Sequence, residues 1–269
     1  MPTTNLSKGI TYFSVLFAFL VFFGCTLAPS EVEARPQASK PSVIPSGTIL
    51  PVVLRTTISP ETAKQGQTVR GQIAQDVPLP DGTKIHKGSK VEGQIVEVAA
   101  AAGASGAKIS IRFDKIYSRG QMILITTNLR AIAGFMEVLR AAEPTQGMGE
   151  TEVANWLTTT QIGGDSVFGV GGPVASAHDT GKIVGKSMMD GGVLVEPSAN
   201  GRCRGAVDGN NHPQPLWVFS SDACGTYGLS DVQITHAGRT APVGTFTLDL
   251  QNRKTKIQSG AGLLLRVIS

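Results

Sequence analysis

The chain has 269 residues and a formal net charge of +4, with its 24 Lys and Arg residues scattered along the sequence. This length suits one large β domain or two small ones, and the lack of a basic run argues against a nucleic-acid-binding arm. Gly is abundant at 32 residues while aromatic residues make up only 6%, a balance that favours many short strands and tight turns.

An apolar run near the start predicts export. It extends from Phe13 to Gly24, with Lys8 upstream and small residues downstream. A membrane-spanning helix needs about 20 apolar residues, whereas a basic start, a shorter apolar core and a small-residue cut site are typical of a secretory signal peptide. We therefore expect a signal peptide over residues 1–34, cut after Ala34. The Pro-rich residues 35–45 are expected to form a flexible tether.

A second cut site competes with the first. Phe22–Cys25 resembles the bacterial lipobox, in which lipid is attached to a cysteine, although the lipobox has Leu, Val or Ile where Phe22 stands. Cys25 is therefore a candidate lipidation residue and a candidate point of membrane attachment. Soluble export, a lipid anchor and an uncleaved N-terminal anchor remain open. The expected location is periplasmic, outer-membrane-associated or extracellular.

Residues 46–130 are predicted to form a β-barrel-like half. Apolar and polar residues alternate in Thr68–Ala74, Val91–Val98 and Lys108–Ile116, as in half-buried strands. Gln121–Thr127 has the composition of a more buried strand. The predicted strands lie a hairpin length apart, with a turn signal at Asp81-Gly82, which indicates an antiparallel sheet that curls into a barrel or sandwich.

Leu129–Ala142 fits either a helix interrupted by Gly134 or a continued strand. Residues 131–269 are predicted to be a Gly-rich β half that packs with the first half. Short strands are expected at Val193–Val195, Leu216–Phe219, Val232–Ile234, Thr245–Leu250 and Leu263–Ile268. The last of these is too apolar to lie exposed at a sheet edge, so we expect it to pair near Ser46–Leu54. The fold class is all-β, an antiparallel barrel or sandwich with long Gly-rich loops.

Two cysteines remain after the signal region, Cys203 and Cys224. In an oxidising compartment they are expected to form a disulfide, which closes a loop of roughly 20 residues and stabilises the fold by about 3 kcal/mol. A metal site is disfavoured because the sequence has no CxxC motif and His212 would need further partners.

Several segments of the first half carry a family-like pattern: Gly47–Pro51, Leu54–Ile58, Gly66–Val69, Asp76–Val77, Ile85–Gly93 and Ile111–Ile116. Together they resemble the C-terminal β-barrel of TrbI-like proteins, which are outer-membrane-complex components of conjugation and type IV secretion systems. That family has proline at the position of His86, and it carries a cytoplasmic segment, a transmembrane helix and a Pro-rich arm without counterparts here. The resemblance implies a barrel and an envelope location. The whole chain resembles exported bacterial proteins of unassigned role.

Candidate sites compete with structural roles. Trp217, Phe219 and Tyr227 lie close to Cys224 and could contact a sugar or peptide ligand, or pack around the disulfide. Asp residues in the Gly-rich loops could hold calcium, but the EF-hand spacing is absent and we expect turns. No dinucleotide or phosphate-loop fingerprint occurs, so no cofactor and no metal are expected.

The sequence favours an exported, non-enzymatic cell-envelope protein that acts as a binding or scaffolding module, with an unidentified polymer or protein partner. The alternative is a secreted hydrolase acting on a polysaccharide or peptide. A Ser-His-Asp site would need loop residues such as His178, Asp179, Asp222 and His236 to converge in one cleft, and no G-x-S-x-G motif is present. No residue is therefore predicted to be catalytic.

Overall fold

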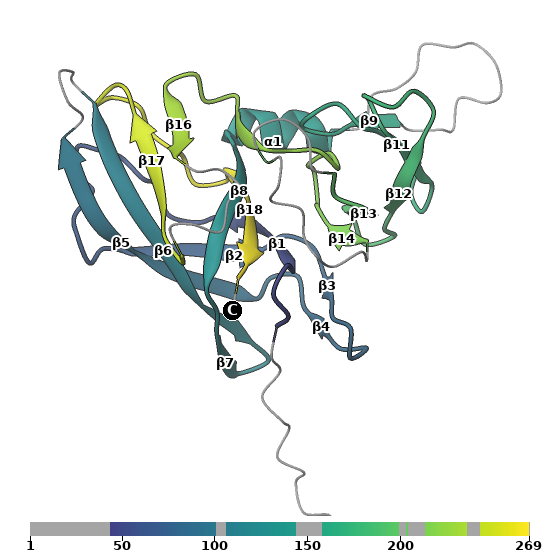
Figure 1. Cartoon of the computed structure of the whole chain (residues 1–269), viewed down its shortest axis with the longest axis horizontal. Helices are drawn as coiled ribbons and strands as arrows, with labels where there is room; N and C mark the ends of the chain where they lie inside the picture. The colour runs from purple at the N-terminus through teal and green to yellow at the C-terminus, as the bar shows by residue number, and fades with distance from the viewer. Residues whose placement is uncertain are drawn as a thin grey trace, which may run out of the picture. The chain divides into compact units, whose positions relative to one another are not determined.

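A computed structural model describes residues 44–100, 106–143, 158–198, 203, 213–235 and 243–268. Residues 40–269 form one compact unit, and its described residues contain three β-sheets and a short helix (Figure 1). The predicted all-β class is confirmed. The predicted signal peptide, Cys25 and most of the predicted tether lie outside the described residues.

The main sheet has ten strands and nearly closes into a barrel. Its strands are β1 (Ile49–Leu54), β2 (Thr68–Ile73), β5 (Lys90–Ala100), β6 (Ala107–Ser118), β7 (Gln121–Leu124), β8 (Thr127–Ala133), β15 (Gly225–Tyr227), β16 (Val232–Thr235), β17 (Phe246–Leu250) and β18 (Gly262–Val267). They follow the order β15-β8-β18-β1-β2-β5-β6-β17-β16, and β7 pairs with β6. The chain after β7 returns to β6, where the Ile125 N–H donates to the Asp114 carbonyl (3.0 Å).

The alternating pattern of the sequence determines the faces of these strands. In β6, Ile109, Ile111 and Phe113 are fully buried in the barrel core, whereas Lys108 and Arg112 are exposed. Ile44 is also buried in this core, so the chain enters the core two residues before Ser46, within the stretch predicted to be a tether.

The first and last strands pair, as predicted. β1 and β18 run antiparallel from Ile49 opposite Arg266 to Val53 opposite Gly262, and β18 also pairs with β8. Residues from both halves of the sequence therefore complete the barrel.

Two smaller sheets accompany the barrel. The six-stranded sheet has the order β14 (Gln214–Pro215), β13 (Val193–Val195), β12 (Ile183–Ser187), β11 (Pro173–Ala175), β10 (Ser166–Phe168) and β9 (Thr158–Thr160). A short hairpin pairs β3 (Val77–Pro78) with β4 (Lys84–Ile85). Its turn includes the predicted Asp81-Gly82, where Gly82 has a φ of +79°, a conformation that glycine adopts at little cost.

The strands β1, β8 and β18 separate two hydrophobic cores. Leu50, Leu129 and Leu265 belong to the barrel core. Side chains on the opposite face, such as Ile49 and Leu264, pack in a second core with Val174, Val195 and Phe219 of the Gly-rich half. We call these three strands the shared wall.

Three sequence expectations are resolved differently by the structure. Leu129–Ala142 is neither all helix nor all strand: β8 continues to Ala133 and helix α1 (Phe135–Ala142) begins after Gly134. The expected strand at Leu216–Phe219 is wrong, because the chain turns there and the Phe219 N–H donates to the Leu216 carbonyl (2.9 Å). β7 is largely exposed instead of buried.

The predicted disulfide is confirmed. Cys203 and Cys224 are bonded, with their Cα atoms 5.8 Å apart, and Cys203 is fully buried. Disulfides persist in oxidising compartments, so the bond indicates an exported protein. Among the described residues, no helix is both long and apolar enough to cross a membrane.

Two neighbouring residues of β18 test whether the two cores unfold together. Leu264 and Leu265 are fully buried in different cores, and Leu→Ala at such sites costs about 2–5 kcal/mol. Because the cores share a wall, we expect Leu264→Ala and Leu265→Ala each to lower the midpoint of a single thermal transition measured by circular dichroism. Leu139→Ala, on an exposed position of α1, is the control and should change stability by less than about 0.5 kcal/mol. Two separate transitions, each sensitive to one variant, would contradict a shared unit.

The contribution of the disulfide to stability should be measurable by urea denaturation. Replacing both Cys203 and Cys224 with Ser opens a loop with a sequence separation of 21, and the chain-entropy estimate is a loss of about 3 kcal/mol. Urea denaturation of the double variant should show this loss. Alkylation of the wild-type protein without reductant, followed by mass spectrometry, should label neither cysteine; two labelled thiols would refute the bond.

Candidate functional site

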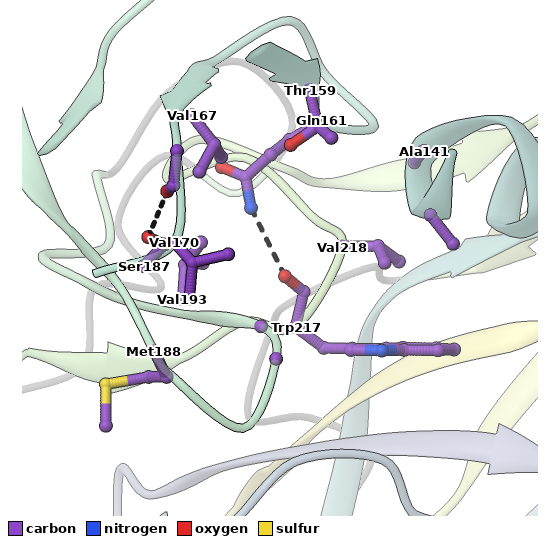
Figure 2. Close-up of a pocket in the computed structure, with 14 residues that line it drawn as sticks. Ala141, Thr159, Gln161, Val167, Val170, Ser187, Met188, Val193, Trp217 and Val218 are labelled. Atoms are coloured by element: carbon purple, nitrogen blue, oxygen red, sulfur yellow. Dashed lines mark hydrogen bonds between the residues drawn. The ribbon is translucent and has the colours of Figure 1, made fainter. Parts of the chain in front are cut away.

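A pocket of about 300 Å³ lies between the six-stranded sheet, the end of α1 and the turn after β14 (Figure 2). We call it the Trp217 pocket. Its lining consists of Ala141, Ala142, Thr159, Gln161, Val167, Gly169, Val170, Ser187, Met188, Gly191, Gly192, Val193, Trp217 and Val218. Small-molecule sites span roughly 300–1,000 Å³, so this pocket suits a compact group.

A side chain from the barrel half shapes one wall of the pocket. Gln75 follows β2 and is almost fully buried. Its Oε1 accepts hydrogen bonds from the N–H groups of Trp217 (2.8 Å) and Val193 (3.2 Å), and its Nε2 donates to the Val193 carbonyl (2.9 Å). Gly192 is needed beside it, because a Cβ there would overlap the Gln75 amide.

The backbone of Trp217 is strained. Its φ is +54°, a left-handed conformation that costs a non-glycine residue of order 1–3 kcal/mol unless its surroundings fix it. Here the Gln75 amide holds the N–H and the Gln161 Nε2 donates to the carbonyl (3.3 Å). Figure 2 shows the indole ring extending away from Gln161, below Val218.

Gln161 leaves one polar atom unsatisfied. The residue is only 5% exposed, and its Oε1 is buried with no hydrogen-bond partner. The orientation of the amide follows from Trp217, because a carbonyl oxygen can only accept and therefore requires the NH₂ group to face it. A buried acceptor without a partner costs about 1–3 kcal/mol, so this atom calls for an explanation.

Among the residues that the structure describes, none that lines the pocket has an ionisable side chain. Its polar side chains belong to Thr159, Gln161 and Ser187, with the Trp217 indole, and the Ser187 hydroxyl already donates to the Gly169 carbonyl (2.7 Å). General acid–base and nucleophilic chemistry need a titratable or activated group in contact with the reacting atoms. The chemistry of this lining is suited to binding a neutral ligand.

The three aromatic residues singled out in the sequence have different surroundings. Trp217 is half-buried and lines the pocket. Phe219 is fully buried in the second core, and Tyr227 packs against it edge-to-face, with ring centroids 6.4 Å apart. The Cys224 N–H donates to the Tyr227 hydroxyl oxygen (3.0 Å), so Phe219 and Tyr227 support the segment that carries the disulfide.

The polar loop residues converge only in part. His178 Nε2 lies 2.8 Å from Asp222 Oδ2, and the Ser220 hydroxyl donates to Asp222 Oδ1 (2.8 Å). The carboxylate thus stands between the other two groups, whereas a hydrolytic triad places the imidazole between serine and carboxylate. Ser220 is also fully buried. Asp179 pairs instead with Lys182 (3.4 Å), and His236 lies outside the described residues.

The Asp-containing loops do not form a metal site in the described part of the chain, where no group of three potential ligands is found. Asp165 is fully buried and accepts hydrogen bonds from the N–H groups of Ala177 (3.1 Å) and Ser221 (2.8 Å). Its carboxylate therefore braces two turns.

A second groove, of about 330 Å³, lies beside β6 and β7. Leu124 and Val243 are largely exposed there, next to Arg112 and Asp114. None of its described lining residues is a strained non-glycine residue or has an unpartnered buried side-chain atom, so the Trp217 pocket is the stronger candidate.

The chain matches no protein-family model, and no curated protein matches it. The site therefore has to be judged from its own geometry. The sequence singles out Trp217 but neither Gln75 nor Gln161, which belong to no motif and bond to Trp217 only in the folded chain.

The ionisation of Tyr227 gives a test of its buried position. Burial raises the pKa of the Tyr227 phenol; the Cys224 N–H opposes this rise, the Asp222 carboxylate adds to it, and Arg130 opposes it. An unfolded tyrosine ionises near pH 10, so its contribution to stability is complete below pH 10 and is lost as the pH rises towards the folded-state pKa. We expect the free energy of unfolding, measured in urea, to fall less steeply above pH 10 in Tyr227→Phe than in wild type. Parallel profiles would contradict this assignment.

Proposed function

We propose that this protein is an exported, non-enzymatic cell-envelope protein, a binding or scaffolding module whose ligand enters the Trp217 pocket. One observation carries the proposal: a strained Trp217 and the unpartnered Gln161 acceptor belong to one pocket, and none of the described residues that line this pocket has an ionisable side chain. Strain and unsatisfied polar groups tend to gather at functional sites. Without a titratable group in contact with the ligand, binding is the chemistry that this pocket supports best.

The disulfide indicates an oxidising, exported compartment, and the finer location belongs to the proposal. We propose a location in the periplasm, at the outer membrane or outside the cell, with a signal peptide ahead of the folded unit. The support is the apolar run Phe13–Gly24 and the lipobox-like Cys25, which would attach the mature chain to a membrane by its N-terminus.

A scaffolding role draws support from the first half of the chain. The segments between Gly47 and Ile116 that resemble the barrel of TrbI-like proteins suggest that this barrel serves an envelope assembly. In this view the barrel is the rigid support, and the Trp217 pocket is the surface that meets the ligand.

The alternative, a secreted hydrolase, has one observation in its favour, the His178–Asp222 pair at 2.8 Å. An imidazole oriented by a carboxylate is half of a general-base arrangement. The described hydroxyl beside the pair, Ser220, is fully buried and bonded to the carboxylate. It is therefore poorly placed to attack a polymer, and we favour binding.

Binding can be followed through Trp217 itself. The chain has two tryptophans, so Trp156→Phe leaves Trp217 as the single tryptophan, whose emission can be excited apart from that of tyrosine. We expect a panel of neutral apolar fragments (indole, phenol, anisole, cyclohexanol and N-acetyl-leucine amide) to include members that change its emission saturably. Acetate and lysine should have no effect, because burying a charge without a partner is costly.

Position 142 supplies the matched control. Ala142 is exposed at the end of α1 and lines the pocket, so Ala142→Phe should fill part of the cavity and abolish the fluorescence response, whereas Ala142→Ser should preserve it. A response that survives in Ala142→Phe, or a panel in which nothing saturates, would refute the Trp217 pocket as the binding site.

A further inference from the structure

The chemistry of the Trp217 pocket also limits what it can bind, an inference that rests on the proposed function. We propose that its ligand is a compact, uncharged apolar group that bears an N–H or O–H donor, and that this donor bonds to Gln161 Oε1. Such a group can come from a free small molecule, for example an indole or a phenol, or from a tryptophan or tyrosine side chain presented by a peptide.

The lack of charged side chains in the described wall argues against an ionic ligand. Valine and alanine side chains, with Met188 and Trp217, make up most of the described wall, and none of the described lining residues carries a charge. An ionised group brought into this wall would lose its hydration without gaining a counter-charge. An uncharged apolar ligand gains from the same wall, roughly 25 cal/mol for each Å² of apolar surface removed from water.

The hydrogen-bond inventory selects a donor. The Gln161 amide cannot turn over, because that would set Oε1 against the Trp217 carbonyl, two acceptors face to face. The atom of the Gln161 amide that lacks a partner is therefore the acceptor Oε1, and an N–H or O–H donor is needed to satisfy it. A ligand without a donor would leave this acceptor unsatisfied.

Access to Oε1 requires a small movement. The atom is closed to solvent, on the side of Val167 in Figure 2. The terminal torsion of glutamine is soft, and the 3.3 Å bond from Nε2 to the Trp217 carbonyl is slightly beyond the usual range for N–H···O bonds. In the proposed complex a modest rotation of the amide brings Oε1 to the cavity that Gln161 lines, and the flexible side chain of Met188, another lining residue, adapts to ligand shape.

Pairs of ligands in which one member has its donor methylated test the hydrogen bond directly, and we call the two members of each pair twins. Indole and 1-methylindole, and phenol and anisole, differ in whether they carry a donor. With isothermal calorimetry on the full folded chain, which is not disturbed by the fluorescence of the ligands themselves, we expect at least one donor to bind about tenfold more tightly than its twin, the change that corresponds to roughly 1.4 kcal/mol. In Gln161→Met, which keeps the length of the side chain and removes the acceptor, the two members of that pair should bind equally.

Each other result has a defined meaning. Equal binding of both twins to the wild type, or a preference that persists in Gln161→Met, overturns the donor inference and leaves the proposed function intact. The same holds if neither pair binds while other neutral apolar fragments still change the emission of Trp217. If nothing in the panel binds, both the proposed function and this inference are wrong.

A further comparison distinguishes the two sources of the ligand group, a free small molecule and a side chain presented by a peptide. The blocked peptide Gly-Gly-Trp-Gly-Gly is compared with free indole in the same assay. Binding of the peptide at least as tight as that of indole assigns the site to a side chain of a partner protein, whereas binding of indole alone assigns it to a free small molecule. Should Gln161→Met fail to fold, as judged by its thermal transition, Gln161→Leu, which also removes the acceptor, takes its place in the comparison.

Discussion

Everything else in this structure depends on the shared wall formed by β1, β8 and β18. These strands are buried on both faces, with Leu265 in the barrel core and the adjacent Leu264 in the second core. Strands buried on both sides appear as continuous apolar runs, and Ile49–Leu54 and Gly262–Val267 have this character. Because the wall joins the first strand of the sheet to the last, neither core can form fully until the ends of the folded unit meet.

Arg130 shows how the second half is held against this wall. A shift of register opposite Leu264 and Leu265 leaves Arg130 as an extra residue in β8, as in a β-bulge. The side chain is 1% exposed and donates to the carbonyls of Ala223 (3.0 Å), Ser198 (2.9 Å) and Ser221 (3.3 Å). These acceptors flank the disulfide in sequence or space, so the buried guanidinium and the Cys203–Cys224 bond stabilise the same region.

The sequence predicted the parts of the fold that follow from local pattern. Alternation identified the long barrel strands such as β6, and the apolar character of Leu263–Ile268 predicted its pairing with β1. The disulfide was predicted from the expected export of the chain and from the two cysteines that remain after the signal region. Leu216–Phe219 was mistaken for a strand because its composition is that of a strand, while the turn is imposed from a distance by the Gln75 amide on the Trp217 N–H. Neither Gln75 nor Gln161 carries a pattern that a sequence reveals, because their roles arise from contacts across more than fifty positions.

The same long-range contacts explain why the Trp217 pocket belongs to the fold as a whole. Gln75 comes from the barrel half, and it bonds to Val193 and Trp217 of the Gly-rich half. Gln214 adds a parallel link, since its Oε1 accepts a hydrogen bond from the Ile49 N–H of β1 (3.1 Å). A side chain held by such supports keeps its geometry better than one on a free loop. The strained conformation of Trp217 therefore persists only while the barrel is intact. The stability of the shared wall thus determines how firmly the residues that line the pocket are held in place.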